Sequence, residues 1–432
     1  MRLTHLAQMR LPFGRLVGYR PAVSGLGRDL PVSFDQRRHV EAGDRPGSWM
    51  ALSLTLPGRA ARADVERAWL AVVGRHGTLR SVFTEHDDGA RLRAVDVAPG
   101  EWVEHEIASG EAVSDAVRGV FDAQCRPYAA PSHYLCLLET AASTTVLIGT
   151  DHAHVDMWSL VVIGRDFVAA HAEAARTPSD AAVHLATAPP FAEHTAALRE
   201  RGSASERIHA RWREILDAGG SVMPVFPLEL DAPAPRPERV EVREVLDVAA
   251  NEALAAAAAR EGVSALALAV SVMTRVTARI AERPLRAVFP VHSRYDHTWH
   301  ESVGWFITNS VLESADASPR ACAAAVKEAV QLGSHPLEDV LTPWGGMPQA
   351  PGMFAISWLD LRRLPVSFAS HHYDAHYVGA PVTTDGVMLW FISDQTGLHL
   401  RCRYPDTLLA REHVGGWLDA VVEGLVEAAS RE

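Results

Sequence analysis

The sequence predicts a mixed fold, of the α/β or α+β class, arranged in two lobes of similar size. Helical and strand periodicities both occur throughout the 432 residues, without the strict alternation of a doubly wound sheet. Proline-containing stretches at 176–180 and 188–190 interrupt the pattern and predict a lobe boundary. The expected lobes are therefore residues 1–182 and 183–432.

The first lobe contains a predicted strand, helix and strand in succession. The leucines of residues 52–56 alternate with polar residues, as in a strand with one buried face. Apolar side chains then recur with helical spacing over 65–73, with Asp64 as the expected N-cap. Extended chain is expected to resume at 82–83.

Residues 144–150, TTVLIGT, are β-branched and apolar and predict a buried strand. This strand leads directly into a segment of aspartates and histidines at 151–156. Apolar residues recur with helical spacing over 160–171. The polar segment is therefore expected on a turn between a strand and a helix, where a rigid scaffold can present reactive side chains.

The second lobe mixes the same kinds of element. The expected elements are a proline-rich loop at 231–242, an alanine-rich helical block at 251–282, a buried strand at 286–294, a hairpin of 386–393 and 398–404, and a final amphipathic helix at 406–429.

Composition excludes several classes of function. Hydrophobic residues make up 48% of the chain and charged residues 22%, which is typical of a folded protein. A net charge of −12 argues against a nucleic-acid partner. No apolar run reaches the roughly 18 residues that a membrane span needs, and four scattered cysteines without CxxC spacing indicate a reducing compartment. A cytoplasmic protein is expected.

The densest group of ionisable residues is Asp151, His152, His154 and Asp156. A histidine held near a carboxylate can act as a general base near neutral pH. The same spacing fits hydrogen-bonded core groups that close a turn. A His-x-His pair can also chelate a metal, but no further ligand pattern such as His-Glu-x-x-His accompanies it, and no metal is expected. The histidines at 371–376 are interpreted as a surface loop.

Covalent catalysis has little support in the sequence, because no G-x-S-x-G segment is present and no cysteine lies in a recognisable pattern with a histidine. Any acyl chemistry is therefore expected to be direct transfer with one base.

Several segments, in matching order, resemble the condensation-domain superfamily, which includes condensation domains of nonribosomal peptide synthetases and stand-alone acyltransferases. Its motif His-His-x-x-x-Asp-Gly is similar to the segment Asp151-His-Ala-His-Val-Asp156-Met157. The similarity extends over nearly the whole chain. The other matching segments are Pro31–Arg37, Arg75–Phe83, Pro290–Arg294 and Val303–Phe306.

The resemblance implies a two-lobed, V-shaped fold like that of chloramphenicol acetyltransferase, with a central tunnel. It implies an acyltransferase of natural-product biosynthesis, acting on a thioester of coenzyme A or of the phosphopantetheine arm of an acyl or peptidyl carrier protein. The acceptor would be a small-molecule hydroxyl or amine, and the product an ester or amide. No bound cofactor is implied, and a monomer is expected.

The resemblance also implies roles for particular residues. His152 would take the acceptor's proton, and Asp156 would pair with Arg294 to hold the turn. The candidates for the tunnel lining are Trp158, Met157, Trp305, Thr308 and Asn309. The two tryptophans equally fit core packing.

Three departures from the superfamily pattern bear on activity. Asp151 replaces the first histidine, as is typical of polyketide-associated acyltransferases, and is expected to support the site. Met157 replaces the glycine and would narrow the tunnel. Thr308 and Asn309 replace the Asn-Thr of the second lobe, so the amide is displaced by one position. Asp151 and Met157 also favour an alternative, a catalytically degenerate domain that recruits a carrier protein or tailoring enzyme.

Overall fold

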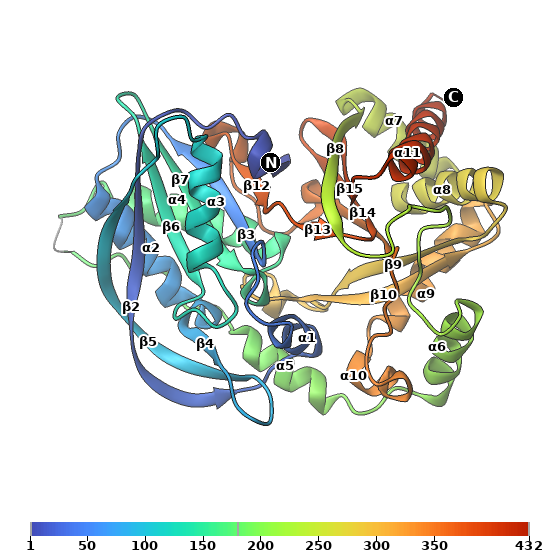
Figure 1. Ribbon diagram of the computed structural model, residues 1–432, viewed down its shortest axis with the longest axis horizontal. Helices are drawn as coiled ribbons and strands as arrows, with labels where there is room; N and C mark the ends of the chain where they lie inside the picture. The colour runs from blue at the N-terminus through green and yellow to red at the C-terminus, as the bar shows by residue number, and fades with distance from the viewer. Residues whose placement is uncertain (1, 179–180, 431–432) are drawn as a thin grey trace. The chain divides into compact units, whose positions relative to one another are not determined.

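The computed structural model describes residues 2–178 and 181–430 (Figure 1). Residues 179–180 of the predicted boundary stretch lie outside these ranges. Both α-helices and β-strands occur throughout, and the strands form two sheets, which confirms the predicted mixed class.

The chain forms two compact units that are not continuous in sequence. Unit 1 contains the chain up to Arg201 together with Arg294–Phe306 and Pro365–Pro381, and unit 2 contains the remainder. The single boundary expected between residues 182 and 183 does not coincide with this division. The segments Arg294–Phe306 and Pro365–Pro381 both belong to unit 1, and the second of them carries one strand of the unit 1 sheet.

Unit 1 is built on an eight-stranded sheet in the order β1-β12-β3-β7-β6-β2-β5-β4. Neighbouring strands are antiparallel except for β1 and β12. The strands are β1 Arg2–His5, β2 Arg15–Leu30, β3 Trp49–Leu56, β4 Ser81–Thr84, β5 Arg91–His105, β6 His133–Glu139, β7 Thr144–Asp151 and β12 His376–Gly379. The α-helices are α1 Phe34–Glu41, α2 Arg62–Arg75, α3 Val113–Gln124, α4 Met157–Ala174 and α5 Phe191–Glu200, and the short 3₁₀ turns are η1 Leu6–Gln8, η2 Gly77–Arg80, η3 His152–His154, η4 His297–Trp299 and η7 Ser370–Tyr373.

Helices cover both faces of this sheet. In Figure 1, α3 crosses the face toward the viewer, whereas α2 and α4 lie behind the sheet. A side chain at Gly149 of β7 would meet Phe121 of α3, and Gly164 of α4 lies against Leu52 of β3. The expectation of a half-buried strand at 52–56 is therefore wrong, since Ser53 on the opposite face of β3 is also buried.

The helix predicted after this strand is present, but it begins two residues before Asp64. Ala61 is the N-cap of α2. Asp64 lies in the first turn instead, where a carboxylate complements the positive end of the helix dipole, and it pairs with Arg67 at 2.7 Å. The apolar stripe that predicted the helix is buried from Val65 to Val73.

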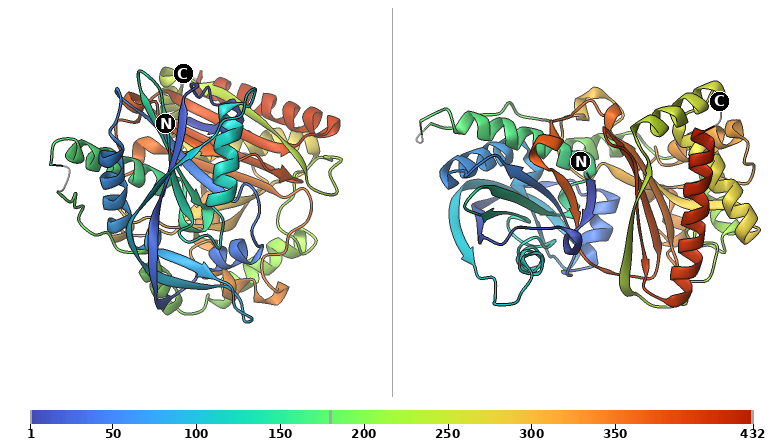
Figure 2. Two further views of the ribbon diagram at one scale, coloured as in Figure 1. Left: turned by 60° about the vertical axis from the view of Figure 1, so that its left-hand side comes forward. Right: turned by 90° about the horizontal axis from the view of Figure 1, so that it is seen from above.

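Unit 2 is built on a seven-stranded sheet in the order β10-β9-β11-β14-β15-β8-β13. Helices α7, α8 and α11 pack together against it, as seen beside the strands in the right-hand view of Figure 2. Its strands are β8 Arg236–Leu246, β9 Leu285–His292, β10 Ile307–Ser314, β11 Phe354–Asp360, β13 Thr383–Thr384, β14 Val387–Asp394 and β15 Gly397–Pro405. Its helices are α6 Glu206–Ala218, α7 Val248–Arg260, α8 Ala265–Ala281, α9 Pro319–Leu332, α10 Leu337–Val340 and α11 Leu408–Ala429, and its 3₁₀ turns are η5 Thr342–Trp344 and η6 Leu361–Arg363.

One prediction for this unit is wrong, and another is confirmed with a break inside it. The loop expected at 231–242 becomes strand β8 from Arg236, because the segment pairs with β15 along its length. The alanine-rich block is two helices bent by 90°, separated by a turn in which Gly262 has a φ of +71°. The hairpin β14–β15 and the final helix α11 are confirmed.

Within the described residues, no single helix has the length and hydropathy required to cross a bilayer. The bent pair α7 and α8 meets the requirement only when its two helices are taken together.

Candidate functional site

The polar segment lies where the sequence predicts it, at the end of a buried strand. All eight residues of β7 are buried, and Asp156 is the N-cap of α4, accepting a hydrogen bond from Ser159 N at 2.7 Å. Between them the chain forms η3 rather than continuing as a strand. His152 and His154 therefore have different surroundings: the ring of His154 packs on Phe83, at 5.4 Å between ring centroids.

His152 is half-buried and held on several sides. Its backbone N–H donates to Ser48 O at 2.9 Å, and its ring lies against Trp305, with 4.2 Å between centroids and 31° between planes. The ring atom Nδ1 is buried without a partner, whereas Nε2 is accessible. Burial lowers the pKa of His152 to about 4. The imidazole is therefore neutral at pH 7 and can accept a proton.

His39 is a second imidazole beside this group, and sequence reasoning missed it. Its ring centroid is 6.1 Å from that of His152 and 5.3 Å from that of Trp305. Arg45 Nη2 lies 2.9 Å from Nδ1 of His39. Because a guanidinium only donates, Nδ1 is the acceptor, and Nε2–H is left to donate to Asp151 at 3.3 Å.

Asp151 is thus a buried carboxylate with defined partners. It also accepts from Ala153 N at 2.9 Å, which caps η3. Burial is the largest influence and would raise its pKa, but the hydrogen bonds from His39 and Ala153 N and the neighbouring histidines together outweigh burial and hold the pKa below its usual value. Asp151 therefore orients His39, while its own backbone leads into His152.

Sequence reasoning had no signal for His39 because 112 residues separate it from Asp151. Its position depends on α1, whose start is a capping box formed by Ser33 and Gln36. Gln36 is fully buried and donates from Nε2 to Ala153 O at 2.8 Å, which ties α1 to η3. The capping-box pattern was readable in the sequence, but the tie to η3 was not.

Asp156 and Arg294 form a buried, bidentate pair. Nη1 and Nη2 of Arg294 donate to the two carboxylate oxygens at 2.7 and 3.1 Å. The carboxylate also accepts from Phe306 N at 3.0 Å. Burial raises the pKa of Asp156, but Arg294 more than offsets this and lowers it below its usual value. The pair fastens the segment 294–306 to the start of α4.

Further contacts hold the same segment in place. Ser159 Oγ donates to Gly304 O at 2.9 Å, and Trp158 Nε1 donates to His300 O at 3.0 Å. Arg294 also lies 4.8 Å from the Trp158 ring centroid. Trp158 is thus 7% exposed and packed around the ion pair, whereas Trp305 is partly exposed beside His152.

A second ion-pair network fixes the other side of this segment. Asp166 of α4 accepts from His76 Nε2 at 2.8 Å and pairs with Arg75 at 2.8 Å. Arg165 bridges Asp166 and Glu301, at 2.7 Å to each. Arg75 and His76 therefore contact α4 and the segment 294–306, and no hydrogen bond or ion pair joins them to His152 among the described residues.

The remaining predicted residues are spread over both units. Met157 is the first residue of α4 and is partly exposed. Thr308 and Asn309 belong to unit 2, where they pair with Val291 and Pro290 across strands β10 and β9. His371 and His372 lie on η7 and are exposed, as expected of a surface loop, whereas His376 is the first residue of β12 and is partly buried.

Among the residues that the structure describes, no group of three or more histidine, cysteine, aspartate or glutamate side chains is placed to hold a metal ion. All four cysteines are free and buried.

Comparison with known proteins places these features in a family. Residues 30–332 match the family described as "Condensation domain". The chain is 32% identical over 218 residues to a probable non-canonical nonribosomal peptide synthetase, CymA, of Salinispora arenicola, and 29% identical over 224 residues to a linear gramicidin synthase of Brevibacillus parabrevis. These matches cover 48% of this chain and 3% of each synthetase, so the chain spans a small part of their length.

Solved structures share the fold at low sequence identity. The PapA2 acyl transferase is 18% identical with a TM-score of 0.85, and the match covers 100% of both chains. The X-domain from teicoplanin biosynthesis is 18% identical with a TM-score of 0.71, over 94% of this chain and 96% of that one. SgcC5 from Streptomyces globisporus is 16% identical with a TM-score of 0.69, over 93% and 99% of the two chains.

Proposed function

The chain belongs to the condensation-domain family, and on that basis we propose that it is an acyltransferase that uses His152 as its general base. The donor is an acyl thioester on a phosphopantetheine arm or on coenzyme A. The acceptor is a hydroxyl or amine of a small molecule, and the product is an ester or amide.

The observation that carries this proposal is the state of His152. Its imidazole is neutral at pH 7, packed against Trp305 and accessible at Nε2. A ring in this state can accept the proton of the acceptor hydroxyl or amine as that group attacks the thioester carbonyl. The same proton then passes to the departing thiolate as the carbon–sulfur bond breaks, so the ring ends neutral and no acyl-enzyme forms.

The other residues of the proposed site act through position. The opposite charges of Asp156 and Arg294 neutralise each other in a buried bidentate pair, and the lowered pKa of Asp156 keeps its carboxylate ionised at pH 7, so the pair holds the turn. Rigid placement of a base accounts for much of its effectiveness, because a shift of about 1 Å can cost a hundredfold in rate.

A second function, recruitment of a carrier protein or tailoring enzyme without catalysis, is favoured by one observation. Met157 occupies the position of the family glycine at the first turn of α4, directly after the Asp156 cap. A side chain there would crowd the approach to His152.

Mass spectrometry of intact proteins separates the two functions. An acyl-loaded carrier protein, or acyl-coenzyme A, is incubated with candidate alcohols and amines, with and without this protein. Loss of the acyl group together with an acylated acceptor supports transfer. A stable complex with the carrier, and no acylated acceptor from either donor type, supports recruitment.

A further inference from the structure

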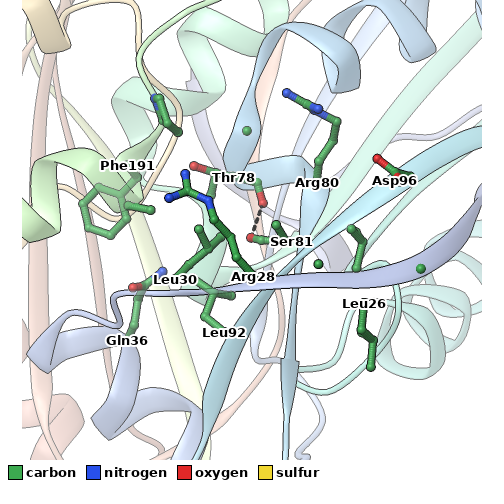
Figure 3. A pocket seen from close by; sticks show the side chains of 17 residues that line it. Leu26, Arg28, Leu30, Gln36, Thr78, Arg80, Ser81, Leu92, Asp96 and Phe191 are labelled. Atoms are coloured by element: carbon green, nitrogen blue, oxygen red, sulfur yellow. Dashed lines mark hydrogen bonds between the residues drawn. The ribbon is translucent and has the colours of Figure 1, made fainter.

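A cavity of about 350 Å³ lies within unit 1 on a set of residues that does not include His152. Its walls come from the facing strands β2 and β5, from η2, from Gln36 of α1 and from the start of α5 (Figure 3). Leu26, Leu30 and Phe191 supply apolar surface around it. The volume is within the range of small-ligand sites.

Two arginines that line this cavity, the exposed Arg28 and the partly buried Arg80, have no partner among the described residues. Arg28 of β2 and Arg80 of η2 come from opposite walls in Figure 3, and neither donates a hydrogen bond to, or forms an ion pair with, any described residue. Nε of Arg80 is buried and unsatisfied. A buried donor without a partner is costly, so it calls for an acceptor that the protein itself does not supply.

Nearby carboxylates do not neutralise these two guanidinium groups. Asp29, adjacent to Arg28, is engaged by Arg93 at 2.8 Å. Asp96 is the single acidic residue among those lining the cavity, against two arginines. The lining is therefore net positive in a chain whose net charge is −12.

The backbone along one wall of the cavity is irregular. The pairing of β2 with β5 shifts register between Ser24 and Leu26 and again between Leu26 and Asp29. Such bulges redirect side chains and are frequent beside binding sites. On the opposite wall, Ser81 Oγ donates to Thr78 O at 2.8 Å, drawn as the dashed line in Figure 3, which fixes the end of η2 that carries Arg80.

We propose that this cavity binds a small molecule through a phosphate group. A phosphate monoester has three terminal oxygens and carries up to two negative charges, so it complements two guanidinium groups better than a carboxylate with a single charge does. The body of the ligand lies against Leu26, Leu30 and Phe191.

The cavity is also linked to the candidate active site. Gln36 lines the cavity and donates to Ala153 O within η3, and Thr78 Oγ1 donates to Val303 O at 2.7 Å, two residues before Trp305. A ligand bound here would contact Gln36, which is hydrogen-bonded to the turn that carries His152, and Thr78, which is hydrogen-bonded to the segment that carries Trp305. The binding claim itself does not depend on acyl transfer.

Calorimetric titration of the full chain with inorganic phosphate, at ionic strength held constant with chloride, tests the proposal. Saturable binding at one site is expected. Arg28→Gln and Arg80→Gln should each raise the dissociation constant about tenfold or more, and the double variant should show no saturable binding. Arg91→Gln is the matched control, because Arg91 is exposed on β5 and already paired with Asp88 at 2.8 Å. It should bind phosphate as the wild type does.

Two further probes sharpen the result. Phenyl phosphate should bind more tightly than inorganic phosphate because its ring covers the apolar wall, and acetate should bind more weakly. Equal affinity in the wild type and the double variant, binding that never saturates, or preference for acetate would each overturn the proposal. No acyl donor is present, so His152→Ala should bind phosphate normally even if it abolishes transfer.

Discussion

His39 connects three functional groups at the residue scale. It donates to Asp151, accepts from Arg45 and lies edge-on to Trp305, the ring that packs against His152. We therefore assign His39 as a positioning residue that acts on the base through packing.

Replacing His39 should change the pKa of His152. In His39→Ala the ring beside His152 and Trp305 is removed, so His152 is less buried and its pKa should rise from about 4. An NMR titration of the histidine ring carbons measures this shift. An unchanged or lower value in the variant would show that the His39 ring does not contribute to the burial of His152.

The low pKa of His152 also predicts the pH dependence of the rate. Because the base is already deprotonated well below neutrality, kcat/KM should be flat from about pH 6 to 8 and should fall only as pH approaches 4. A profile measured with a saturating donor tests this. An acid limb centred near 6.5 would mean that His152 titrates as an ordinary exposed histidine.

At the scale of elements, the pair of Asp156 and Arg294 joins the start of α4 to the segment 294–306. Deleting one partner leaves a buried charge uncompensated. Asp156→Ala should therefore lower the free energy of unfolding by about 3–5 kcal/mol, measured by urea denaturation.

A double variant separates charge from packing at this junction. Asp156→Ala combined with Arg294→Met removes both charges, so part of the stability should return. The lost N-cap of α4 remains a cost of about 1 kcal/mol. If the double variant is as unstable as Asp156→Ala, or less stable, the penalty does not come from the unpaired guanidinium.

The elements that sequence patterns predicted best are those with a single strong periodicity. Strand β7 and helices α4 and α11 follow directly from apolar runs and stripes. Strand β8 was missed because its prolines suggested a loop, and only pairing with β15 makes it extended. The break between α7 and α8 was missed because alanine-rich sequence is helical on both sides of Gly262.

At the scale of the whole molecule, the chain crosses between units in ways that no local pattern predicts. Strand β12 enters the sheet of unit 1 between β1 and β3, although more than 300 residues separate it from them. The segment carrying Arg294 and Trp305 returns to unit 1 in the same manner. Family resemblance supplied the expected pairing of Asp156 with Arg294, but local periodicity could not have supplied it.

Stability should depend on pH through buried neutral histidines. Burial lowers the pKa of His76, His133, His152 and His154 from an ordinary value of 6.5, to about 3 for His133 and about 4 for His152. Below pH 6.5 the unfolded chain binds protons that the folded chain does not, so stability falls as pH decreases. The free energy of unfolding should be several kcal/mol smaller at pH 5.5 than at 7.

Urea denaturation at the two pH values measures this loss. Carboxylates with lowered pKa values lose their contribution to the free energy of unfolding only below about pH 4.5. The change in stability between pH 7 and pH 5.5 therefore reports on the histidines. Equal or greater stability at pH 5.5 would contradict the account.

The central claim is that His152 is the base of an acyl transfer reaction, and single-turnover measurement with an acyl-loaded donor and its acceptor tests it most directly. His152→Ala should transfer at least about a hundredfold more slowly than the wild type. His86→Ala, at an exposed histidine, should transfer at the wild-type rate. Transfer by His152→Ala at the wild-type rate would contradict the claim.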